Sequence, residues 1–521
     1  MKSIQLNGNN WTSSMQYDVS VQPEIKLTFS QPLKESSIAN AIIIKDAAGA
    51  KIPLTFTLQN KDSVLLVKPT SNLSHLNKYN FSIYTSLQSS EGGTLNTEAN
   101  NGFITSIDSS RKFPVIPDET LLTKIQQQTF KYFWDFAHPV SGLARERSNG
   151  DNETVTSGGS GFEIMAVITG IHRNFITRQE GLERMKVIVS FLKNNAQTFK
   201  GAFPHWLNGT TGAAIPFSTK DNGADIVETS FLMQGLLCAR QYFNLTNTDE
   251  TNLRADINTL WNAVEWSWFR QNDQNILYWH WSPDYNWDMN MQVKGWNECL
   301  ITYVLAAAST THSISKAIYD EGWASGGNIK NGNTFFNYTL PLGELNGGPL
   351  FFEHYSFLGI KPFTLTDTYA DYELQTKNHT LINYNYCISN PKGYYGYSDS
   401  CWGLTASDIQ NGYTASSPTN DVGVIAPTAA ISSLPYTPAE SMKALKFFYY
   451  VLGDKLWKDY GFVDAFSLHD IWFANSFLAI DQGPQIIMIE NYRSGLLWNL
   501  FMSCPEVKAG LKSLGFNAPG L

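Results

Sequence analysis

The chain has 521 residues, of which 43% are apolar and 16% charged, and its formal net charge is −9. This balance excludes a disordered, collagen-like or coiled-coil protein, and without a basic surplus no nucleic-acid partner is expected. The length exceeds what one hydrophobic core usually organises, so we expect two domains, or one large domain with an appendage. Aromatic residues make up 13% of the chain, which indicates a function that uses flat rings.

Residues 1–107 show apolar and polar residues alternating with a period of two. The clearest runs lie at 24–29, 54–58, 63–67 and 79–84, with Gly, Asn, Ser and Pro clusters between them. Such runs predict half-buried strands of a β-sandwich. The region resembles the bacterial immunoglobulin-like modules that precede secreted enzymes. We expect it to be a spacer or a packing partner, with carbohydrate binding as the alternative.

The pattern changes after residues 108–117, a polar stretch that ends in prolines and is typical of a linker. Beyond it, apolar residues recur at spacings near three and four, which predicts amphipathic helices, and Asp118 is expected to cap the first of them. Helices of common length would number about a dozen over residues 118–521. Further helical segments are expected near 161–176, 181–198, 224–245, 252–270, 296–310, 312–324, 438–456 and 484–502.

Long loops are expected at 205–222, 271–294 and 326–350, and loops of that length usually build a site rather than merely connect helices. The five cysteines lie far apart and form no metal-binding pair, so neither a disulfide framework, a metal site nor a cofactor is expected. The longest apolar runs are shorter than the roughly 18 residues that cross a bilayer. No membrane span is therefore predicted, and we expect a monomer.

The start of the chain bears on its location. Met1, Lys2 and Ser3 lead straight into polar residues, without the apolar core of a signal peptide. We expect that a native export signal has been removed, and that the protein is periplasmic or lies at the cell surface.

The first candidate site is a group of acids at the start of an apolar helix. Asp221 precedes the expected helix, and Asp225 and Glu228 fall in its first turns, three residues apart and so on one face. A stabilised helix end on the surface is the alternative. The residues after Glu228 are almost wholly apolar, which favours a buried helix end. Crowded acids raise one another's pKa, as a general acid working near neutral pH requires.

Two further acids follow the same pattern. Glu298 is expected in the first turn of another apolar helix, again with a purely structural role as the alternative. Asp481 is expected in the loop before a helix that begins at Pro484, where it could face a cleft. Glu490 and Arg493, three residues apart, are expected to pair with each other.

Acids at the starts of helices would gather at one mouth if the helices alternate in direction around a toroid. A cleft that combines carboxylates with aromatic walls suits a sugar polymer, because rings stack on sugar faces and acids protonate the leaving oxygen. The expected sugar-contacting residues, including those from the 490–493 segment, are His205, Trp206, Tyr278, Trp281, Trp287, Trp296, Glu490, Tyr492 and Arg493.

Other chemistries lack their motifs. No nucleophile elbow, zinc-protease motif, Walker loop or dinucleotide fingerprint occurs in a suitable context. The stretch 158–161 (Gly-Gly-Ser-Gly) lacks the lysine of a phosphate-binding loop, and we expect it to be a loop before a helix.

Three segments resemble a known family: 225–229 (Asp-Ile-Val-Glu-Thr), 297–301 (Asn-Glu-Cys-Leu-Ile), and 481–484 with 489–498. They are similar to motifs of the bacterial glucoamylase-like domain family, which includes glycoside hydrolase family 144, the endo-β-1,2-glucanases, and domains of cyclic β-1,2-glucan synthases. The resemblance covers about 115–521. It implies an (α/α)6 toroid, inverting hydrolysis and a β-1,2-linked glucan, as polysaccharide or oligosaccharide, as substrate.

The expected fold class is therefore multidomain: an Ig-like β-sandwich over 1–107, a linker over 108–117 and an all-α (α/α)6 catalytic domain over 118–521. Carried over by position, the family's site matches Asp221, Asp225, Glu228, Glu298 and Asp481, with His205 among the sugar-contacting groups. The resemblance leaves the individual roles open.

From their surroundings we favour Glu298 or Glu228 as the general acid, and Asp225 or Asp481 as the base acting through water. Three alternatives remain at this point: an exo-acting hydrolase of another glucan, a polysaccharide lyase, and a glycan-binding protein without turnover.

Overall fold

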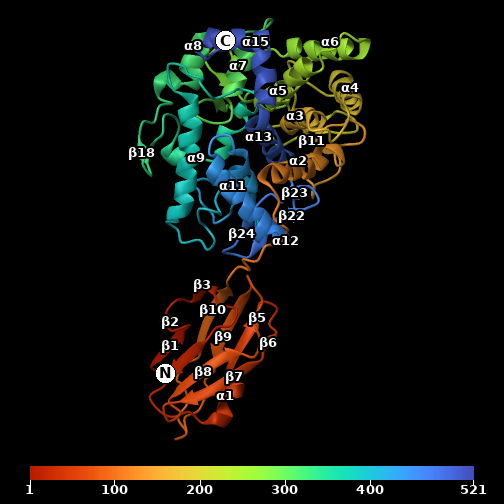
Figure 1. Cartoon of the computed structure of the whole chain (residues 1–521). Coiled ribbons are helices and arrows are strands. Elements are labelled where there is room, and N and C mark those ends of the chain that lie inside the picture. Colours follow the sequence, from red (N-terminus) through yellow and green to blue (C-terminus); the bar gives the residue numbers. More distant parts are fainter. The chain divides into compact units, whose positions relative to one another are not determined.

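The chain forms two structural units in a computed structural model that describes all residues, 1–521 (Figure 1). The N-terminal unit comprises Met1–Arg111 together with the short segments Tyr394–Gly396 and Leu468–Trp472. The remaining residues from Lys112 onward form the helical unit. The change in hydrophobic period after residue 107 therefore falls close to the division between the units.

The N-terminal unit is made of two five-stranded sheets, ordered β2-β1-β4-β8-β7 and β3-β10-β9-β5-β6. All neighbouring strands are antiparallel except β10 and β3, which are parallel. The strands are β1 (Ser3–Leu6), β2 (Asn9–Asn10), β3 (Met15–Val19), β4 (Ile25–Thr28), β5 (Ile42–Asp46), β6 (Lys51–Ile52), β7 (Leu54–Gln59), β8 (Val64–Pro69), β9 (Lys78–Ile83) and β10 (Ala99–Thr105), with one short helix, α1 (Glu35–Ala41).

Burial in this unit follows the alternation in the sequence. The four expected runs form β4, β7, β8 and β9, and the inward residues of β9 are Tyr79, Phe81 and Ile83. Trp11, the one tryptophan of residues 1–107, is buried, with its ring 5.8 Å from that of Phe81 and 6.0 Å from that of Phe103. Its ring therefore belongs to the core of the sandwich.

The helical unit contains fourteen α-helices and a set of short strands and turns. Its α-helices are α2 (Asp118–Trp134), α3 (Ser157–His172), α4 (Arg178–Asn194), α5 (Ile226–Tyr242), α6 (Thr248–Ala263), α7 (Leu300–Ala308), α8 (Lys316–Ile318), α9 (Tyr372–Ser389), α10 (Pro427–Ser432), α11 (Pro438–Lys446), α12 (Gly453–Leu456), α13 (Ala479–Ser494), α14 (Leu496–Ser503) and α15 (Pro505–Leu514).

The short elements connect these helices. The 3-10 and π turns are η1 (Trp266–Arg270), η2 (Tyr319–Trp323), η3 (Ser325–Gly327), η4 (Leu345–Gly347), η5 (Leu350–Glu353), η6 (Ser356–Leu358) and η7 (Phe447–Val451). The strands are β11 (Thr154–Thr156), β12 (Trp206–Asn208), β13 (Ala214–Ile215), β14 (Ala224–Asp225), β15 (Leu277–Tyr278), β16 (His280–Trp281), β17 (Gln292–Val293), β18 (Thr334–Phe335), β19 (Tyr338–Thr339), β20 (Ala406–Ile409), β21 (Gly412–Ala415), β22 (Trp457–Lys458), β23 (Gly461–Phe462), β24 (Phe466–Ser467) and β25 (Trp472–Phe473).

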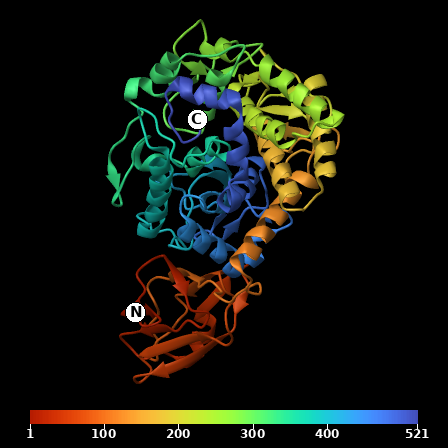
Figure 2. The same cartoon turned by 45° about the horizontal axis from the view of Figure 1, so that its top comes forward.

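The helices form two classes by burial. In α3, α5, α7 and α13 most residues are buried on every side, whereas α2, α4 and α6 bury one face only. The buried helices pack on one another: α3 contacts both α5 and α13, α5 contacts α7, and α10 contacts α13. Figure 2 shows the helices following one another around this unit in chain order, from orange to blue.

The glycine-rich stretch 158–161 is helical, and the expectation of a loop there was wrong. It forms the first turn of α3 after Ser157. A Cβ at Gly161 would lie 2.1 Å from the carbonyl oxygen of Phe231, and one at Gly235 would lie 2.2 Å from the carbonyl oxygen of Gly161. These glycines therefore let the backbones of α3 and α5 approach more closely than side chains would allow.

Several helix limits also differ from expectation. Asp118 is the first residue of α2 rather than its cap, which is Pro117, and α13 begins at Ala479 with Pro484 inside its first turns. A proline there is tolerated because the first amides of a helix have no intrahelical partner. Helix α9 was missed, because its sequence is polar and lacks a clear apolar stripe.

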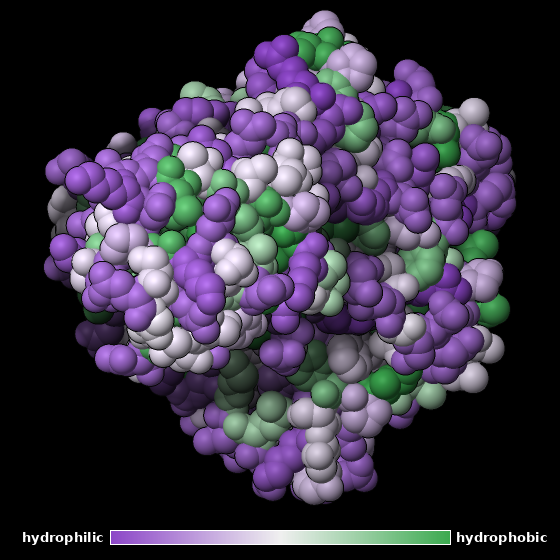
Figure 3. All heavy atoms as spheres, turned by 90° about the horizontal axis from the view of Figure 1, so that it is seen from below, coloured by the Kyte–Doolittle hydropathy of each residue, from purple (hydrophilic) through white to green (hydrophobic).

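All five cysteines are free and buried. No helix combines the length and the apolar character that a membrane span needs. The face shown in Figure 3 is mostly hydrophilic, with apolar residues in small scattered groups.

Candidate active site

The starts of the buried helices meet at one cavity of about 450 Å³. Thr156, which caps α3, Glu228, in the first turn of α5, Glu298, two residues before α7, and Leu478, which caps α13, all line it. The full lining consists of Glu146, Arg147, Thr156, His205, Trp206, Phe217, Glu228, Trp279, Glu298, Phe351, Tyr355, Ala406, Tyr413, Ala415, Leu478 and Ile480.

Two small sheets bring the loops to this cavity. Strand β11 leads into α3 and pairs with β12, so that Thr156 lies opposite Trp206, next to His205. Strand β14 leads into α5 and pairs with β16, so that Asp225 lies opposite His280. Backbone pairing thus brings His280 directly opposite Asp225 and holds the segment next to His205 against the start of α3.

Asp225 is the cap of α5. Its Oδ1 accepts hydrogen bonds from the backbone amides of Val227 and Glu228, both at 2.9 Å, and its Oδ2 lies 3.0 Å from Nδ1 of His205. Burial favours the neutral acid, but the hydrogen bond from His205 and the charges of His280 and His205 outweigh it and lower the pKa of Asp225. Asp225 is therefore an anion that organises its neighbours.

Glu228 lies one turn further along the same helix and lines the cavity. Its Oε2 accepts the backbone amide of Gly158 at 2.8 Å, and its Oε1 lies 4.0 Å from Nε2 of His205. Burial raises the pKa of Glu228 to about 7, against the opposing charge of His205. For His205, the charge of Glu228 and the hydrogen bond to Asp225 outweigh burial and raise the pKa to about 9. At neutral pH, His205 is therefore an imidazolium between two acids.

Glu298 approaches the cavity from the turn before α7 rather than from the helix itself, which begins at Leu300. Its backbone carbonyl accepts a hydrogen bond from the hydroxyl of Ser356. Burial, reinforced by the charges of Glu228 and Asp225, raises the pKa of Glu298 to about 8. This carboxyl therefore holds its proton at neutral pH while it faces the cavity.

Asp221 is buried and does not line the cavity, and its Oδ2 lies 3.3 Å from Nε2 of His280. Burial and the charge of Asp225 raise the pKa of Asp221 to about 7. His205, Asp221 and Asp225 bring possible metal-ligand atoms within 4.8 Å of one another. Nδ1 of His205 and Oδ2 of Asp225 are hydrogen-bonded to each other. We therefore interpret the cluster as a hydrogen-bonded network of acids and histidine.

Asp481 is placed differently from the sequence expectation. It lies in the first turn of α13 and is buried, and it is absent from the cavity lining, although its neighbour Ile480 belongs to it. Its carboxyl hydrogen-bonds that of Asp464, and burial together with the charge of Asp464 raises the pKa of Asp481 well above its ordinary value. Two carboxyls in contact cannot both ionise readily, so this pair retains a proton.

The aromatic wall only partly matches the expected one. Trp206 lines the cavity, together with Phe217 and Tyr413, whose side chains are 50% and 48% exposed. The ring of Phe217 lies 4.2 Å from that of His205 and 4.8 Å from that of Trp206. Trp279 completes this wall. Phe217 and Trp279 lie in loops that the sequence marked as site-building.

The other expected rings do not line the cavity. Tyr278 and Trp296 are core residues, and the indole of Trp296 donates to the buried Glu353 at 3.3 Å. Trp281 and Trp287 pack against Trp268, with ring centres 5.5 and 4.8 Å apart. This aromatic cluster explains why the loop 278–287 is rich in rings: it holds the loop together.

The segment 490–493 lies away from the cavity. Glu490 is eleven residues, or about 16 Å, along α13 from the helix start. It is fully buried and binds Arg173 at 2.6 and 2.8 Å, whereas Arg493 binds Glu119, and Tyr492 is 41% exposed. The expected Glu490–Arg493 pair is therefore replaced by two other pairs, one with Arg173, which follows α3, and one with Glu119 on α2.

Glu146 and Arg147 line the cavity but carried no signal in the sequence, because they stand in an irregular loop without a recognisable motif. Their position depends on contacts with the distant segment that precedes α13. The backbone of Arg147 forms an antiparallel bridge with Leu478, and the amide of Ala479 donates to the carbonyl of Glu146 at 3.0 Å. Because the paired segments are far apart in sequence, no local sequence pattern predicts this pairing.

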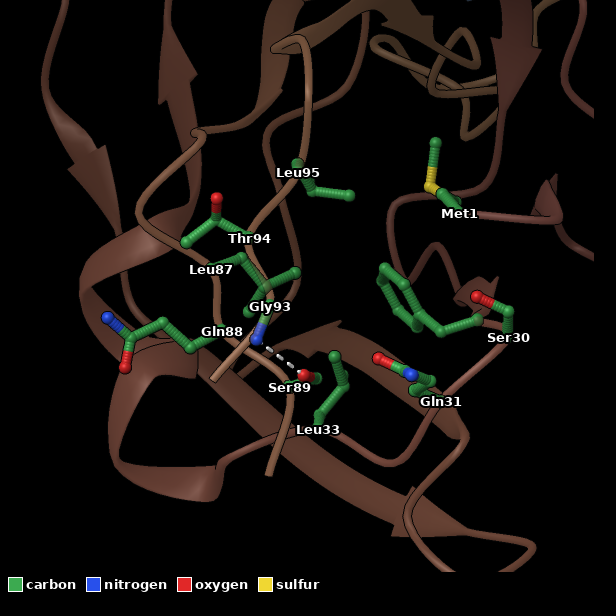
Figure 4. A pocket seen from close by; sticks show the side chains of 11 residues that line it. Met1, Ser30, Gln31, Leu33, Leu87, Gln88, Ser89, Gly93, Thr94 and Leu95 are labelled. Atoms are coloured by element: carbon green, nitrogen blue, oxygen red, sulfur yellow. Dashed lines mark hydrogen bonds between the residues drawn. The ribbon is translucent and has the colours of Figure 1, made fainter. Parts of the chain in front are cut away.

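Two other cavities lack the same chemistry. One of about 100 Å³ in the N-terminal unit has no acidic or basic side chain in its lining, and there the amide of Gly93 donates to Ser89 Oγ at 2.9 Å (Figure 4). Another, of about 490 Å³, contains Lys361 and Lys508 but no Asp or Glu side chain. Acid–base chemistry is therefore best supported at the cavity that Glu228 and Glu298 line.

The chain matches two family models and is similar to several known proteins. Residues 290–505 match a family model described as "Putative glucoamylase", and residues 12–105 match one described as a bacterial Ig-like domain. A curated relative, the exo beta-1,2-glucooligosaccharide sophorohydrolase (non-reducing end) of Parabacteroides distasonis, is 48% identical over 418 residues. That match covers 76% of this chain, and the chain spans only 58% of the relative's length.

Two solved structures are similar over the same share of the chain. A "putative glucoamylase" from Bacteroides uniformis is 56% identical with a TM-score of 0.77, covering 78% of this chain and 99% of its own. The endo-beta-1,2-glucanase from Chitinophaga pinensis, solved with sophorotriose and glucose, is 54% identical with a TM-score of 0.76. That match covers 78% of this chain and all of the glucanase chain.

Proposed function

Because the chain belongs to the bacterial glucoamylase-like family and carries an N-terminal bacterial Ig-like domain, we propose that it is a glycoside hydrolase that cleaves β-1,2-linked glucan. The observation that carries this proposal is the cavity in which Glu298 and Glu228 face a wall of aromatic rings. Rings of this kind stack on sugar faces, and a protonated carboxyl beside them can protonate a glycosidic oxygen. The names of the relatives supply the β-1,2 linkage.

For the fold of the helical unit we propose an (α/α)6 toroid. The mutual packing of α3, α5, α7, α10 and α13, and the start of four of these helices at one cavity, support it. We propose that the Ig-like domain spans residues 1–107, the linker 108–117 and the catalytic domain 118–521. An exported protein and a monomer remain our proposals for location and assembly.

The general acid in this proposal is Glu298. Its pKa of about 8 keeps it protonated at neutral pH, and its carboxyl reaches the cavity. Its proton goes to the glycosidic oxygen as the bond from that oxygen to the anomeric carbon breaks, and the carboxylate that remains is reprotonated from solvent.

Two carboxyls are candidates for the base that activates water. Glu228 lines the cavity, and the imidazolium of His205 favours its anion. Asp481 is the other candidate, but it does not line the cavity and its pair with Asp464 retains a proton, so Glu228 is the better placed of the two. Asp225 is assigned a positioning role, because its two oxygens are taken by the cap of α5 and by His205. Inversion requires acid and base about 6.5–9.5 Å apart.

Product analysis tests the substrate class. The full chain is incubated with linear β-1,2-glucan, starch and laminarin, and reducing ends are followed. Release from β-1,2-glucan alone is expected. Sophorose as the sole product would indicate exo action, as in the name of the curated relative, and a ladder of oligosaccharides would indicate endo action. Cleavage of a uronate polymer instead would favour the lyase, and binding without any release would favour a glycan-binding protein.

Azide distinguishes the two candidate bases. Replacing the true base by alanine leaves room for azide, which needs no deprotonation and attacks the anomeric carbon in place of water. We expect rescue, with an inverted glycosyl azide as product, for only one of Glu228→Ala and Asp481→Ala. Rescue of neither, with β-1,2-glucan cleavage intact in the parent, would contradict this choice of candidates.

A further inference from the structure

Arg147 is the one arginine or lysine in the lining of the cavity. Its side chain is 27% exposed and held between two acids. Nε donates to Glu146 Oε2 at 2.8 Å, and one terminal nitrogen, Nη1, donates to both oxygens of Asp408 at 3.1 and 3.3 Å. The two carboxylates outweigh burial and raise the pKa of Arg147 further, so the guanidinium stays charged.

The acids that hold Arg147 are themselves fixed. Asp408 Oδ2 accepts the hydroxyl of Ser476 at 2.5 Å, and the amide of Asp408 donates to Asp464 at 2.7 Å. The backbone of Arg147 bridges to Leu478, and the amide of the next residue, Ser148, donates to Phe477 at 2.9 Å. Both ends of the side chain are therefore anchored before any ligand arrives, which reduces the entropy lost on binding.

The other terminal nitrogen, Nη2, makes no hydrogen bond within the chain. A guanidinium carries five N–H donors, and the bonds to Glu146 and Asp408 leave the two on Nη2 available. Because Arg147 lines the cavity, a bound ligand can meet these donors. Two flanking carboxylates already balance the positive charge, so an acidic ligand would gain little there, whereas neutral oxygens can accept the free N–H groups.

We propose that Arg147 is a substrate-binding and specificity-determining residue that donates hydrogen bonds from Nη2 to hydroxyl oxygens of a neutral glucosyl unit. This inference rests on the proposed function, since it places the same sugar in the same cavity. Glu146 and Asp408 act through Arg147 and are positioning residues. A lysine cannot replace Arg147, because one ammonium lacks the planar fork that reaches both acids and the ligand together.

The test measures sophorose binding by calorimetry in the full chain carrying Glu298→Gln, which slows turnover. We expect Arg147→Lys and Arg147→Gln to raise the Kd of sophorose by about 10- to 100-fold, the size of a charged hydrogen bond. Arg145→Lys is the matched control. Arg145 stands two residues away in the same loop, binds the carbonyls of Asn152 and Phe136, and does not line the cavity, so its Kd should equal that of the parent.

A Kd for both Arg147 variants within about twofold of the parent would overturn the inference, because it would leave no hydrogen bond to lose. A loss of affinity accompanied by loss of the folded state would be resolved by Arg147→Lys, which keeps the charge between the two acids. If the parent binds no sophorose or β-1,2-glucan, the proposed function fails and this inference falls with it. Tighter binding of a glucuronate disaccharide than of sophorose would contradict the neutral ligand.

Discussion

At the scale of single residues, protonation separates the acids of the cavity. Burial raises the pKa of Glu298 to about 8 and the pKa of Glu228 to about 7, both above the ordinary pKa of a glutamic acid. The carboxyl of Glu298, which has the higher pKa, is therefore the more fully protonated of the two near neutral pH.

The alkaline limb of the pH profile follows from this difference. A general acid must be protonated, and the raised pKa keeps Glu298 protonated up to about pH 8, so kcat/KM should fall as the pH rises through that value. Glu298→Gln should lower kcat at least about 100-fold and remove this limb. Glu183→Gln, at a half-exposed surface site, is the matched control. An unchanged limb in Glu298→Gln would show that another group donates the proton.

Glu163 predicts a pH dependence of stability. It is fully buried in α3, and its nearest cation, Arg184, is 3.7 Å away, so burial raises its pKa well above the ordinary value. The folded state then holds a proton that the unfolded state loses above about pH 4.5, and stability falls with rising pH by up to about 1.4 kcal/mol per unit. Denaturant unfolding of Glu163→Gln at pH 5 to 8 should show a shallower fall than the parent. A parallel fall in both proteins would contradict the assignment.

At the scale of elements, the contact between α3 and α5 depends on glycine. In Gly161→Ala the new Cβ would meet the backbone of Phe231 at 2.1 Å, and backbone cannot move aside as a side chain can. We expect the free energy of unfolding to fall by about 1–3 kcal/mol. In Gly181→Ala, also within a helix, the nearest atom is the flexible end of Ile171 at 2.4 Å, so a smaller loss is expected. Equal losses in the two variants would refute the role of close packing.

The start of α5 combines a cap with a charge, and two variants separate them. Asp225→Asn keeps an oxygen for the amides of Val227 and Glu228 but removes the anion beside His205, so stability should change little while the pKa of His205 falls from about 9. Asp225→Ala should also cost about 0.5–2 kcal/mol of stability. NMR titration of His205 and denaturant unfolding check the two effects. A pKa for His205 that is unchanged in Asp225→Asn would contradict the charge coupling.

At the scale of the whole molecule, every residue that lines the cavity with Glu228 and Glu298 belongs to the helical unit. The B. uniformis and C. pinensis structures correspond almost entirely to 78% of this chain. We therefore expect residues 112–521, produced alone, to fold and to keep the kcat of the full chain on a soluble gluco-oligosaccharide. Circular dichroism and reducing-end assays check this expectation. An unfolded or inactive fragment would mean that the helical unit needs residues 1–111.

The sequence by itself determined the classes of structure. Alternation of apolar residues located β4, β7, β8 and β9, and spacings near three and four located most of the helices of the second unit. These patterns are local, because a strand or helix with one buried face repeats its apolar residues at its own period. Acids at the starts of apolar helices were visible for the same reason, and Glu228 and Glu298 do line the cavity.

Only the tertiary structure decided which of the candidate residues meet. It separated Asp481, which is paired with Asp464 and does not line the cavity, from Glu298, which does, and it placed Glu490 about 16 Å along α13. It also brought Arg147 to the lining by pairing its loop with a segment more than 300 residues later. Local periodicity carries no record of such partners, because hydrogen bonds and contacts between distant segments depend on how whole elements pack rather than on the residues next to them.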